Sequence, residues 1–305
     1  MKSLLIGSTG IRSSRIVQGC MRMTGDGSPA AWEHGKKAIR AALEEGITHF
    51  DHADIYGEGR CEELFGEVLR ESPAVRGAIT ITSKCAVRRK DTPSLGDPSR
   101  YDFSREHIVR SVEGSLRRLG TETLDILLLH RPDYLFRAEE VAQAFRELQA
   151  SGKVRHFGVS NFTPSQVSLL RRYCTMPLAM NQVEINIHRI TAIQDGTLDQ
   201  CQELGITPEA WCPLGGVAYT AWGSTLTKKD EERIAAELAH QSKKYGAEPW
   251  VIVLAWLLKL PSGVLPIIGT TTPARIRESK RALELAYTRE DWYRLLEART
   301  GVPSD

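Results

Sequence analysis

The sequence predicts a fold of the α/β class, a (β/α)8 TIM barrel that takes up residues 1–305 as a single domain. Two observations predict it. Short apolar, β-branched runs alternate with longer segments of helical spacing, and this alternation occurs eight times without a low-complexity linker. Parallel strands joined by helical crossovers bury both of their faces, and eight of them close into one domain of ~250 residues.

The elements follow one another regularly along the chain. Residues 8–10 allow a short N-terminal β-hairpin that closes the bottom of the barrel. Capping residues mark several helices: Ser104 and Gly120 flank one, and Thr163 begins a capping box. Strands are expected at 14–19, 48–53, 78–84, 124–130, 154–160, 178–184, 207–213 and 264–269, with helices at 29–46, 61–71, 104–120, 138–152, 163–173, 196–205, 230–246, 248–261, 272–283 and 288–299.

An open, doubly wound sheet is the alternative arrangement of such elements. That fold carries a GxGxxG turn after its first strand. Residues 18–25, QGCMRMTG, do not have this spacing, so the sequence favours the closed barrel.

Composition limits the classes of partner. The formal net charge of +2 gives no basic field that would gather nucleic acid or an anionic membrane surface. No apolar run approaches the ~18 residues of a membrane span. The six cysteines lack CxxC spacing and indicate reduced thiols. We therefore expect a cytoplasmic protein that acts on a small molecule.

Ionisable side chains end three consecutive strands of the expected barrel, where enzymes of this architecture place catalytic groups. Asp51 ends the second strand, Lys84 the third and His130 the fourth, and Tyr56 follows in a glycine-marked loop. Each of them alone is more often structural, since a lysine at a strand end usually extends to water. The four together predict a functional site.

Asp51 is the expected partner of Lys84. It lies deeper in its strand than Asp54, and a shielded carboxylate couples more strongly to a neighbouring ammonium. Side chains alternate along a strand, so His52 points to the opposite face and is expected to pack behind the site. Asp54 is expected to order the loop.

Several segments resemble the aldo-keto reductase superfamily, in its bacterial-type NADP-dependent oxidoreductase branch. FDHADIYG, ITSK and LLLHRPD resemble its catalytic segments, and LIGSTGIRSSRIVQGCMRM, GKVRHFGVSNFTPSQ, NQVEINI, AWCPLGG and LPIIGTTTPARIRES extend the similarity over nearly the whole chain. The resemblance implies NADP(H) as cofactor, reduction of an aldehyde or ketone, and the catalytic residues Asp51, Tyr56, Lys84 and His130. Tyr56 is then the proton donor, and the Lys84 ammonium is expected to lower its pKa. His130 is expected to hydrogen-bond the substrate carbonyl.

The segment after the last strand indicates a phosphate site. Thr272 precedes a helix that begins at Pro273, and barrels often hold a phosphate after strands seven and eight. The resemblance places the 2′-phosphate of NADP on Thr270, Thr271 and Arg275. It also implies cofactor contacts for Met21, for Ser160, Asn161 and Gln182 at the nicotinamide amide, for Trp211 at the ring, for Leu214 and Gly215 at the pyrophosphate, and for Cys212, Gly269 and Ser279.

Four positions depart from the family pattern. Many members have a lysine at the position of Gly269 and an asparagine at that of Ser279. A tyrosine or phenylalanine is common at Trp211, and a serine at Cys212. Loss of the lysine removes a phosphate contact, so the expected preference for NADPH over NADH is weaker than usual.

The expected substrate pocket is apolar and aromatic, which suits aldehydes or ketones of modest polarity. Besides Met21 and Tyr56, its expected lining is Met23, Tyr134, Phe136, Tyr219 and Trp222.

Two other functions fit parts of the pattern. A non-catalytic or slow nucleotide-binding regulatory subunit of the same superfamily would bind cofactor without rapid turnover. A metal-dependent barrel hydrolase would use Asp51, His52, Asp54 and His130 as ligands. Lys84 at the neighbouring strand end repels a cation, so no metal site is expected.

Overall fold

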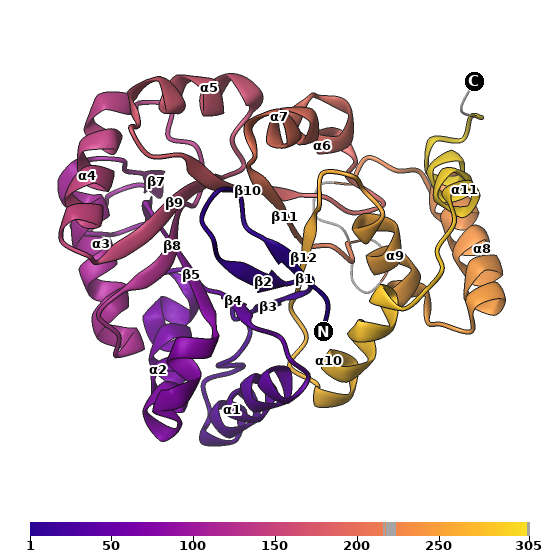
Figure 1. Cartoon of the computed structure of the whole chain (residues 1–305), viewed down its shortest axis with the longest axis horizontal. Helices are drawn as coiled ribbons and strands as arrows, with labels where there is room; N and C mark the ends of the chain where they lie inside the picture. The colour runs from indigo at the N-terminus through magenta and orange to yellow at the C-terminus, as the bar shows by residue number, and fades with distance from the viewer. Residues whose placement is uncertain (216, 218–223, 304–305) are drawn as a thin grey trace.

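The computed structural model describes residues 1–215, 217 and 224–303, and its strands close into an eight-stranded parallel barrel surrounded by helices (Figure 1). The order around the barrel follows the chain, which confirms the predicted fold class. The barrel strands are β3 (Val17–Gly19), β4 (His49–Asp51), β5 (Thr80–Cys85), β8 (Leu124–Leu129), β9 (Val154–Ser160), β10 (Leu178–Glu184), β11 (Thr207–Trp211) and β12 (Leu265–Ile268).

The helices begin and end at the expected signals. The Ser104 side chain accepts from the N–H of His107, Gly120 has a φ of 64°, and Thr163 forms its capping box with Gln166. The helices are α1 (Pro29–Glu44), α2 (Arg60–Glu71), α3 (Arg105–Leu119), α4 (Ala138–Ala150), α5 (Pro164–Tyr173), α6 (Thr191–Gln194), α7 (Thr197–Leu204), α8 (Lys228–Tyr245), α9 (Pro249–Leu258), α10 (Pro273–Ser279) and α11 (Arg289–Thr300), with the 3-10 turns η1 (Tyr56–Gly59), η2 (Pro73–Ala78) and η3 (Lys280–Leu283).

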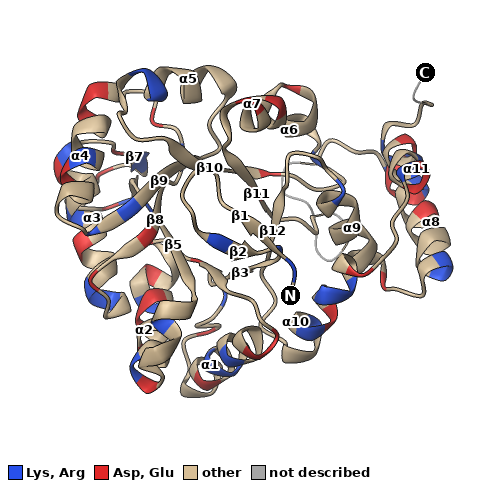
Figure 2. Cartoon of the chain, viewed as in Figure 1, with Lys and Arg blue, Asp and Glu red and all other residues tan. Residues whose placement is uncertain are grey.

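Charged residues of both signs are spread over the outer helices (Figure 2). Among the described helices, none has the length and apolar character needed to cross a membrane.

The predicted N-terminal hairpin is present. Its strands β1 (Ser3–Leu5) and β2 (Arg12–Ser14) pair antiparallel. The N–H of Gly7 donates to Thr207 Oγ1 at 2.8 Å, at the start of β11, and Ile6 packs in the apolar cluster of the barrel interior. The hairpin therefore closes the end of the barrel opposite the carboxyl ends of the strands.

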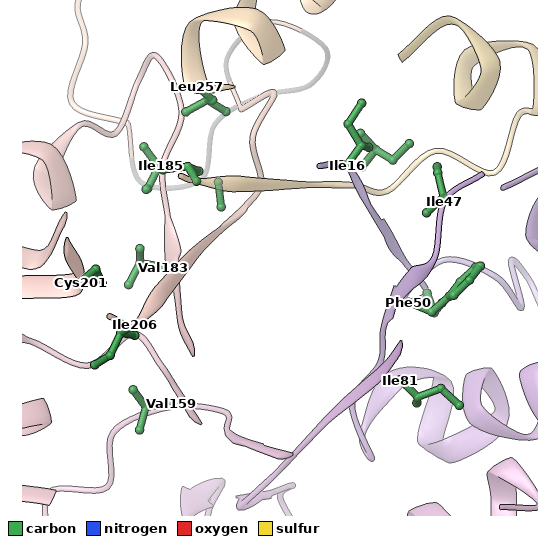
Figure 3. Packing of buried hydrophobic residues seen from close by; sticks show 14 of the residues in the cluster. Ile16, Ile47, Phe50, Ile81, Val159, Val183, Ile185, Cys201, Ile206 and Leu257 are labelled. Atoms are coloured by element: carbon green, nitrogen blue, oxygen red, sulfur yellow. The ribbon is translucent and has the colours of Figure 1, made fainter. Parts of the chain in front are cut away.

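Apolar side chains form two layers that follow the period-two alternation of the strands. In β8, Ile126 and Leu128 point into the barrel, whereas Leu127 and Leu129 join the large cluster between strands and helices. Figure 3 shows Phe50 and Ile81 of this outer layer, from neighbouring strands β4 and β5. The same alternation turns the polar residues on either side of Phe50 into the barrel.

One paired element was not expected. The long loop after β5 contains a short antiparallel ladder of β6 (Val87–Arg88) with β7 (Arg100–Tyr101). Two-residue strands carry too little apolar alternation to be recognised in a sequence, and this ladder directs part of the loop over the mouth of the barrel.

Candidate active site

Asp51 and Lys84 end neighbouring strands and form a buried ion pair. The ladder continues beyond β4, because the N–H of Asp54 donates to the carbonyl of Lys84 at 3.0 Å. Lys84 Nζ lies 2.7 Å from Asp51 Oδ1 and 2.8 Å from Oδ2, and it also donates to the carbonyl of His52 at 2.8 Å. Burial disfavours the ammonium, but the interactions with Asp51 and Tyr56 together outweigh it and raise the pKa of Lys84. The ion pair expected from the sequence is present.

Tyr56 lies against this pair. It begins η1, where Gly57 and Glu58 both have positive φ angles near 55–59° and turn the chain back toward the barrel. Lys84 Nζ is 3.2 Å from the phenol oxygen. Burial raises the pKa of Tyr56 and Lys84 opposes that rise, with a net increase. Lys84 lowers the pKa of Tyr56 as expected, but burial outweighs the ammonium, and the phenol keeps its proton at neutral pH.

His130 follows β8 and packs edge-on against Tyr56, with ring centroids 5.8 Å apart and an interplanar angle of 82°. Burial, together with repulsion from Lys84 and Arg131, keeps the pKa of His130 well below its ordinary value. The imidazole is therefore neutral. It can donate one hydrogen bond to a carbonyl oxygen beside Tyr56 without adding charge.

A cavity of about 540 Å³ opens at this end of the barrel, and Asp51, Tyr56 and His130 form part of its wall. A second cavity of about 650 Å³ shares Arg22, Leu214 and Gly269 with it. The predicted cofactor residues Met21, Ser160, Asn161, Gln182, Trp211, Cys212, Leu214 and Gly269 line the first, and Gly269, Thr270, Thr271, Arg275 and Ser279 line the second. The two cavities fit an extended ligand whose anionic end meets threonines and an arginine, as a nicotinamide dinucleotide does.

Asn161 directly follows β9, and its hydrogen bonds connect the end of this strand to the ends of β8, β10 and β11 around the first cavity. Its N–H donates to the carbonyl of Gln182 at 2.8 Å, its Nδ2 to the carbonyl of His130 at 3.3 Å, and its Oδ1 accepts from Trp211 Nε1 at 2.9 Å. Its φ of 62° is rare for a residue with a side chain, as is the φ of 49° at Cys212. Such backbone conformations persist where the surroundings fix them, typically at ligand sites.

Part of the predicted pocket lining does not line the cavity, and these positions are corrected. Met23 is only 1% exposed and belongs to the core, and Phe136 packs on Phe103 and Phe162. Tyr134 is 89% exposed. The reason is common to all three: loop paths decide which way these side chains point, and no periodicity fixes a loop path.

Other predicted positions have different outcomes. Tyr219 and Trp222 lie outside the described residues. Gly215 does not line either cavity, because it packs against Asn186, whose Nδ2 would lie 2.8 Å from an added Cβ. Thr272 precedes α10 without a side-chain cap, and its N–H donates to Thr270 Oγ1.

Several residues that sequence reasoning missed form the cavity wall. Val87, Tyr101 and Arg89 come from the loop that contains the β6–β7 ladder, and Arg131 follows His130 in the chain. The guanidinium of Arg131 lies 4.8 Å above the ring of Trp211. The pocket is therefore more polar than the sequence indicated.

The arrangement around Asp51 does not suit a metal site. The ring of His52 turns away and packs edge-on against Phe65 at 4.6 Å, as expected, while Asp51 is held by Lys84. Burial raises the pKa of Asp54 to about 7, which makes it a poor ligand at neutral pH. Across the described residues, no three His, Cys, Asp or Glu side chains are grouped to hold a metal ion.

The fold and the site define a (β/α)8-barrel enzyme with a protonated phenol, a buried ammonium and a neutral imidazole at the carboxyl ends of its strands. Its family follows from comparison with known proteins. The model of the Aldo/keto reductase family matches residues 15–299, and the chain belongs to this family. It is an oxidoreductase of the kind that carries out NAD(P)H-dependent carbonyl reduction.

Individual relatives agree with this assignment. The chain is 40% identical to the oxidoreductase YdhF of Escherichia coli, over 99% of this chain and 98% of that protein. It is 38% identical to a 6-dehydroglucose reductase of Agrobacterium fabrum, over 94% and 95%. Among solved structures, it resembles the glycerol dehydrogenase of Gluconobacter oxydans with a TM-score of 0.84 and 25% identity, over 99% and 97% of the two chains.

Proposed function

We propose that this chain is an NADPH-dependent carbonyl reductase in which Tyr56 donates a proton to the carbonyl oxygen of an aldehyde or ketone. The observation that carries the proposal is the 3.2 Å contact between Lys84 Nζ and the Tyr56 hydroxyl in the cavity wall. The cofactor, when bound, supplies hydride to the carbonyl carbon. The protein supplies the position and the proton.

The pKa directions support these roles. The raised pKa of Tyr56 keeps the phenol protonated before the reaction. After proton transfer, the Lys84 ammonium stabilises the phenolate, and Asp51 keeps Lys84 charged. His130, held neutral by burial, donates to the same carbonyl oxygen and orients it toward Tyr56.

The preference for NADPH rests on Arg275, which lines the second cavity with Thr270 and Thr271. A hydrogen bond to a charged group contributes about 1.5–3 kcal/mol. We therefore expect Arg275→Ala to lower kcat/KM for NADPH by about tenfold to a hundredfold and to change kcat/KM for NADH by less than about threefold. Initial rates with each cofactor measure the difference.

Arg277→Ala is the matched control for this variant. Arg277 lies in the same helix, but its Nε donates to Glu45 at 3.0 Å and it lines neither cavity. With each of the two cofactors, kcat/KM of this control should equal that of the wild type. Equal losses for NADPH and NADH in Arg275→Ala would show that the residue does not select the 2′-phosphate.

The proposed substrates are carbonyl compounds that carry several hydroxyl groups. Arg89, Arg131 and Tyr101 offer donors along the cavity wall. The named activities of two relatives, 6-dehydroglucose reductase and glycerol dehydrogenase, support a sugar- or polyol-like substrate.

NADPH oxidation with paired substrates tests this choice. Each hydroxylated aldehyde or ketone is compared with an unsubstituted alkyl compound of the same carbon number. We expect kcat/KM to be at least about tenfold higher for the hydroxylated member, because its hydroxyl groups would accept hydrogen bonds from the donors of the cavity wall. The reverse order would contradict the proposed substrate class while leaving the reductase reaction in place.

A further inference from the structure

A second carboxyl group is buried directly beneath the proposed catalytic ion pair. Glu209 lies in the middle of β11, points into the barrel and is fully buried. Gln182 Nε2 donates to Glu209 Oε2 at 2.9 Å and to Asp51 Oδ1 at 2.9 Å. One amide group therefore bridges the two carboxyl groups.

This bridge fixes the orientation of Gln182. A carboxamide nitrogen has two N–H groups, and here each faces a carboxyl oxygen. Turning the amide over would place its oxygen against Asp51, where no hydrogen is available. Gln182 therefore presents its nitrogen to the barrel interior. Since it also lines the first cavity, its oxygen is the atom left to accept a hydrogen bond from a bound group.

Among the described residues around Glu209, no cation is free to neutralise it. Asp51 and His49 face it from β4, Lys84 from β5 and Gln182 from β10, while Leu265 is its neighbour in β12. Lys84 is already paired with Asp51. The only other basic group of this set is the imidazole of His49.

His49 remains neutral. Its Nδ1 lies 2.9 Å from Ser13 Oγ, its Nε2 lies 2.7 Å from Thr82 Oγ1, and burial lowers its pKa to about 3. Its Nδ1 is 3.6 Å from Glu209 Oε1, too long for a hydrogen bond. Within the described residues Glu209 Oε1 has no hydrogen-bond partner.

A buried carboxylate in such surroundings is costly, so Glu209 holds a proton at neutral pH. Burial first, and then repulsion from Asp51, raises its pKa to about 8. The described residues around Glu209 thus form one ion pair, Asp51 with Lys84, beside a neutral acid.

We propose that Glu209 is a positioning residue for the reduction: its neutral carboxyl group holds the Gln182 amide against Asp51, and its ionisation in alkaline solution slows proton donation by Tyr56. This inference rests on the proposed function. The effect of ionisation on proton donation follows from electrostatics. A second negative charge beside Asp51 offsets the Lys84 cation that stabilises the Tyr56 phenolate. Proton transfer to the substrate then becomes less favourable.

Glu209→Gln tests the effect of charge, since it keeps the shape and an acceptor for Gln182 but cannot ionise. In the wild type, kcat for carbonyl reduction should fall as the pH rises through about 8. The variant should match the wild type within about twofold at pH 6.5 and exceed it by about tenfold at pH 9, the size of one pKa unit. An unchanged alkaline decline of kcat would overturn the proposed ionisation effect.

Glu209→Leu tests the positioning effect, because it removes the acceptor as well. We expect it to weaken NADPH binding by about tenfold by fluorescence titration, while Glu209→Gln binds as the wild type does. Equal affinity in all three proteins would overturn the positioning role. If Glu209→Leu does not fold, the Glu209→Gln pH profile still decides the ionisation effect.

A readout independent of turnover separates this inference from the proposed function. The neutral acid binds its proton more tightly in the folded protein than in the unfolded chain, so the contribution of Glu209 to wild-type stability should fall as the pH rises from about 4.5 to about 8. The midpoint of thermal unfolding of Glu209→Gln, relative to the wild type, should therefore rise over this interval. A constant difference would contradict a buried neutral Glu209, even if the chain reduces no carbonyl compound.

Asp125→Asn is the control for that measurement. Asp125 is a buried strand carboxylate too, but it is paired with Arg76 and Arg155 outside the barrel interior. Its unfolding midpoint relative to the wild type should not rise between pH 6 and pH 8, and the alkaline decline of kcat should be unchanged.

Discussion

Phenylalanine at position 56 is expected to abolish carbonyl reduction while leaving NADPH bound. Tyr56→Phe removes only the hydroxyl that lies 3.2 Å from Lys84 Nζ, and the ring can keep its edge-on contact with His130. Loss of a positioned proton donor lowers kcat by about a hundredfold to ten-thousandfold. Single-turnover oxidation of NADPH with an aldehyde measures the loss, and fluorescence titration measures cofactor affinity.

Tyr134→Phe is the matched control. It removes the same hydroxyl from a residue that is 89% exposed and lines neither cavity. Its kcat should stay within about twofold of the wild type, as for most surface substitutions. A Tyr56→Phe protein that retained more than a tenth of the activity would show that another group donates the proton, and His130 would be the next candidate.

The barrel and the grouping of polar strand ends follow directly from sequence periodicity. Apolar runs such as 124–130 identify buried strands, and in a closed parallel barrel the ends of neighbouring strands must meet. This is why Asp51 and Lys84 could be paired in advance from their positions alone. To predict this pair, one needs to know only the order of the strands and which of the two carboxylates lies deeper in its strand.

Contributions from loops could not be predicted in the same way. Tyr134 and Phe136 are two residues apart in one connection, yet one is exposed and the other is partly buried against the core. Arg89 reaches the cavity wall through a loop whose path depends on the short β6–β7 ladder. The net pKa shift of Tyr56 was also beyond the sequence, because it depends on how completely the phenol is enclosed.

The role of Glu209 could be predicted from the sequence only in part. An acid in the middle of a strand that is buried on both faces is a visible signal in the sequence, since such a group needs a partner. Its neighbours could not be read, because they come from β4, β5 and β10. The sequence pattern therefore shows that Glu209 needs a partner, whereas only the three-dimensional packing identifies that partner.

Replacement of Lys84 by methionine is expected to lower both stability and activity. Lys84→Met keeps a side chain of similar length in a fully buried position but leaves the Asp51 carboxylate without its cation. Breaking a buried ion pair from one side lowers the free energy of unfolding by about 3–5 kcal/mol. Urea unfolding measures this loss. The deficit should shrink as the pH is lowered, because protonation removes the unpaired charge.

The double variant Asp51→Asn/Lys84→Met separates the two roles of the pair. With neither charge of this pair left, it should recover at least about 2 kcal/mol of the stability that Lys84→Met loses, as paired replacements of buried ions do. Its kcat should nevertheless remain as low as that of Lys84→Met, because no ammonium is left to stabilise the Tyr56 phenolate. If activity returned together with stability, the ion pair would serve the fold alone, and Lys84 would have no part in proton donation.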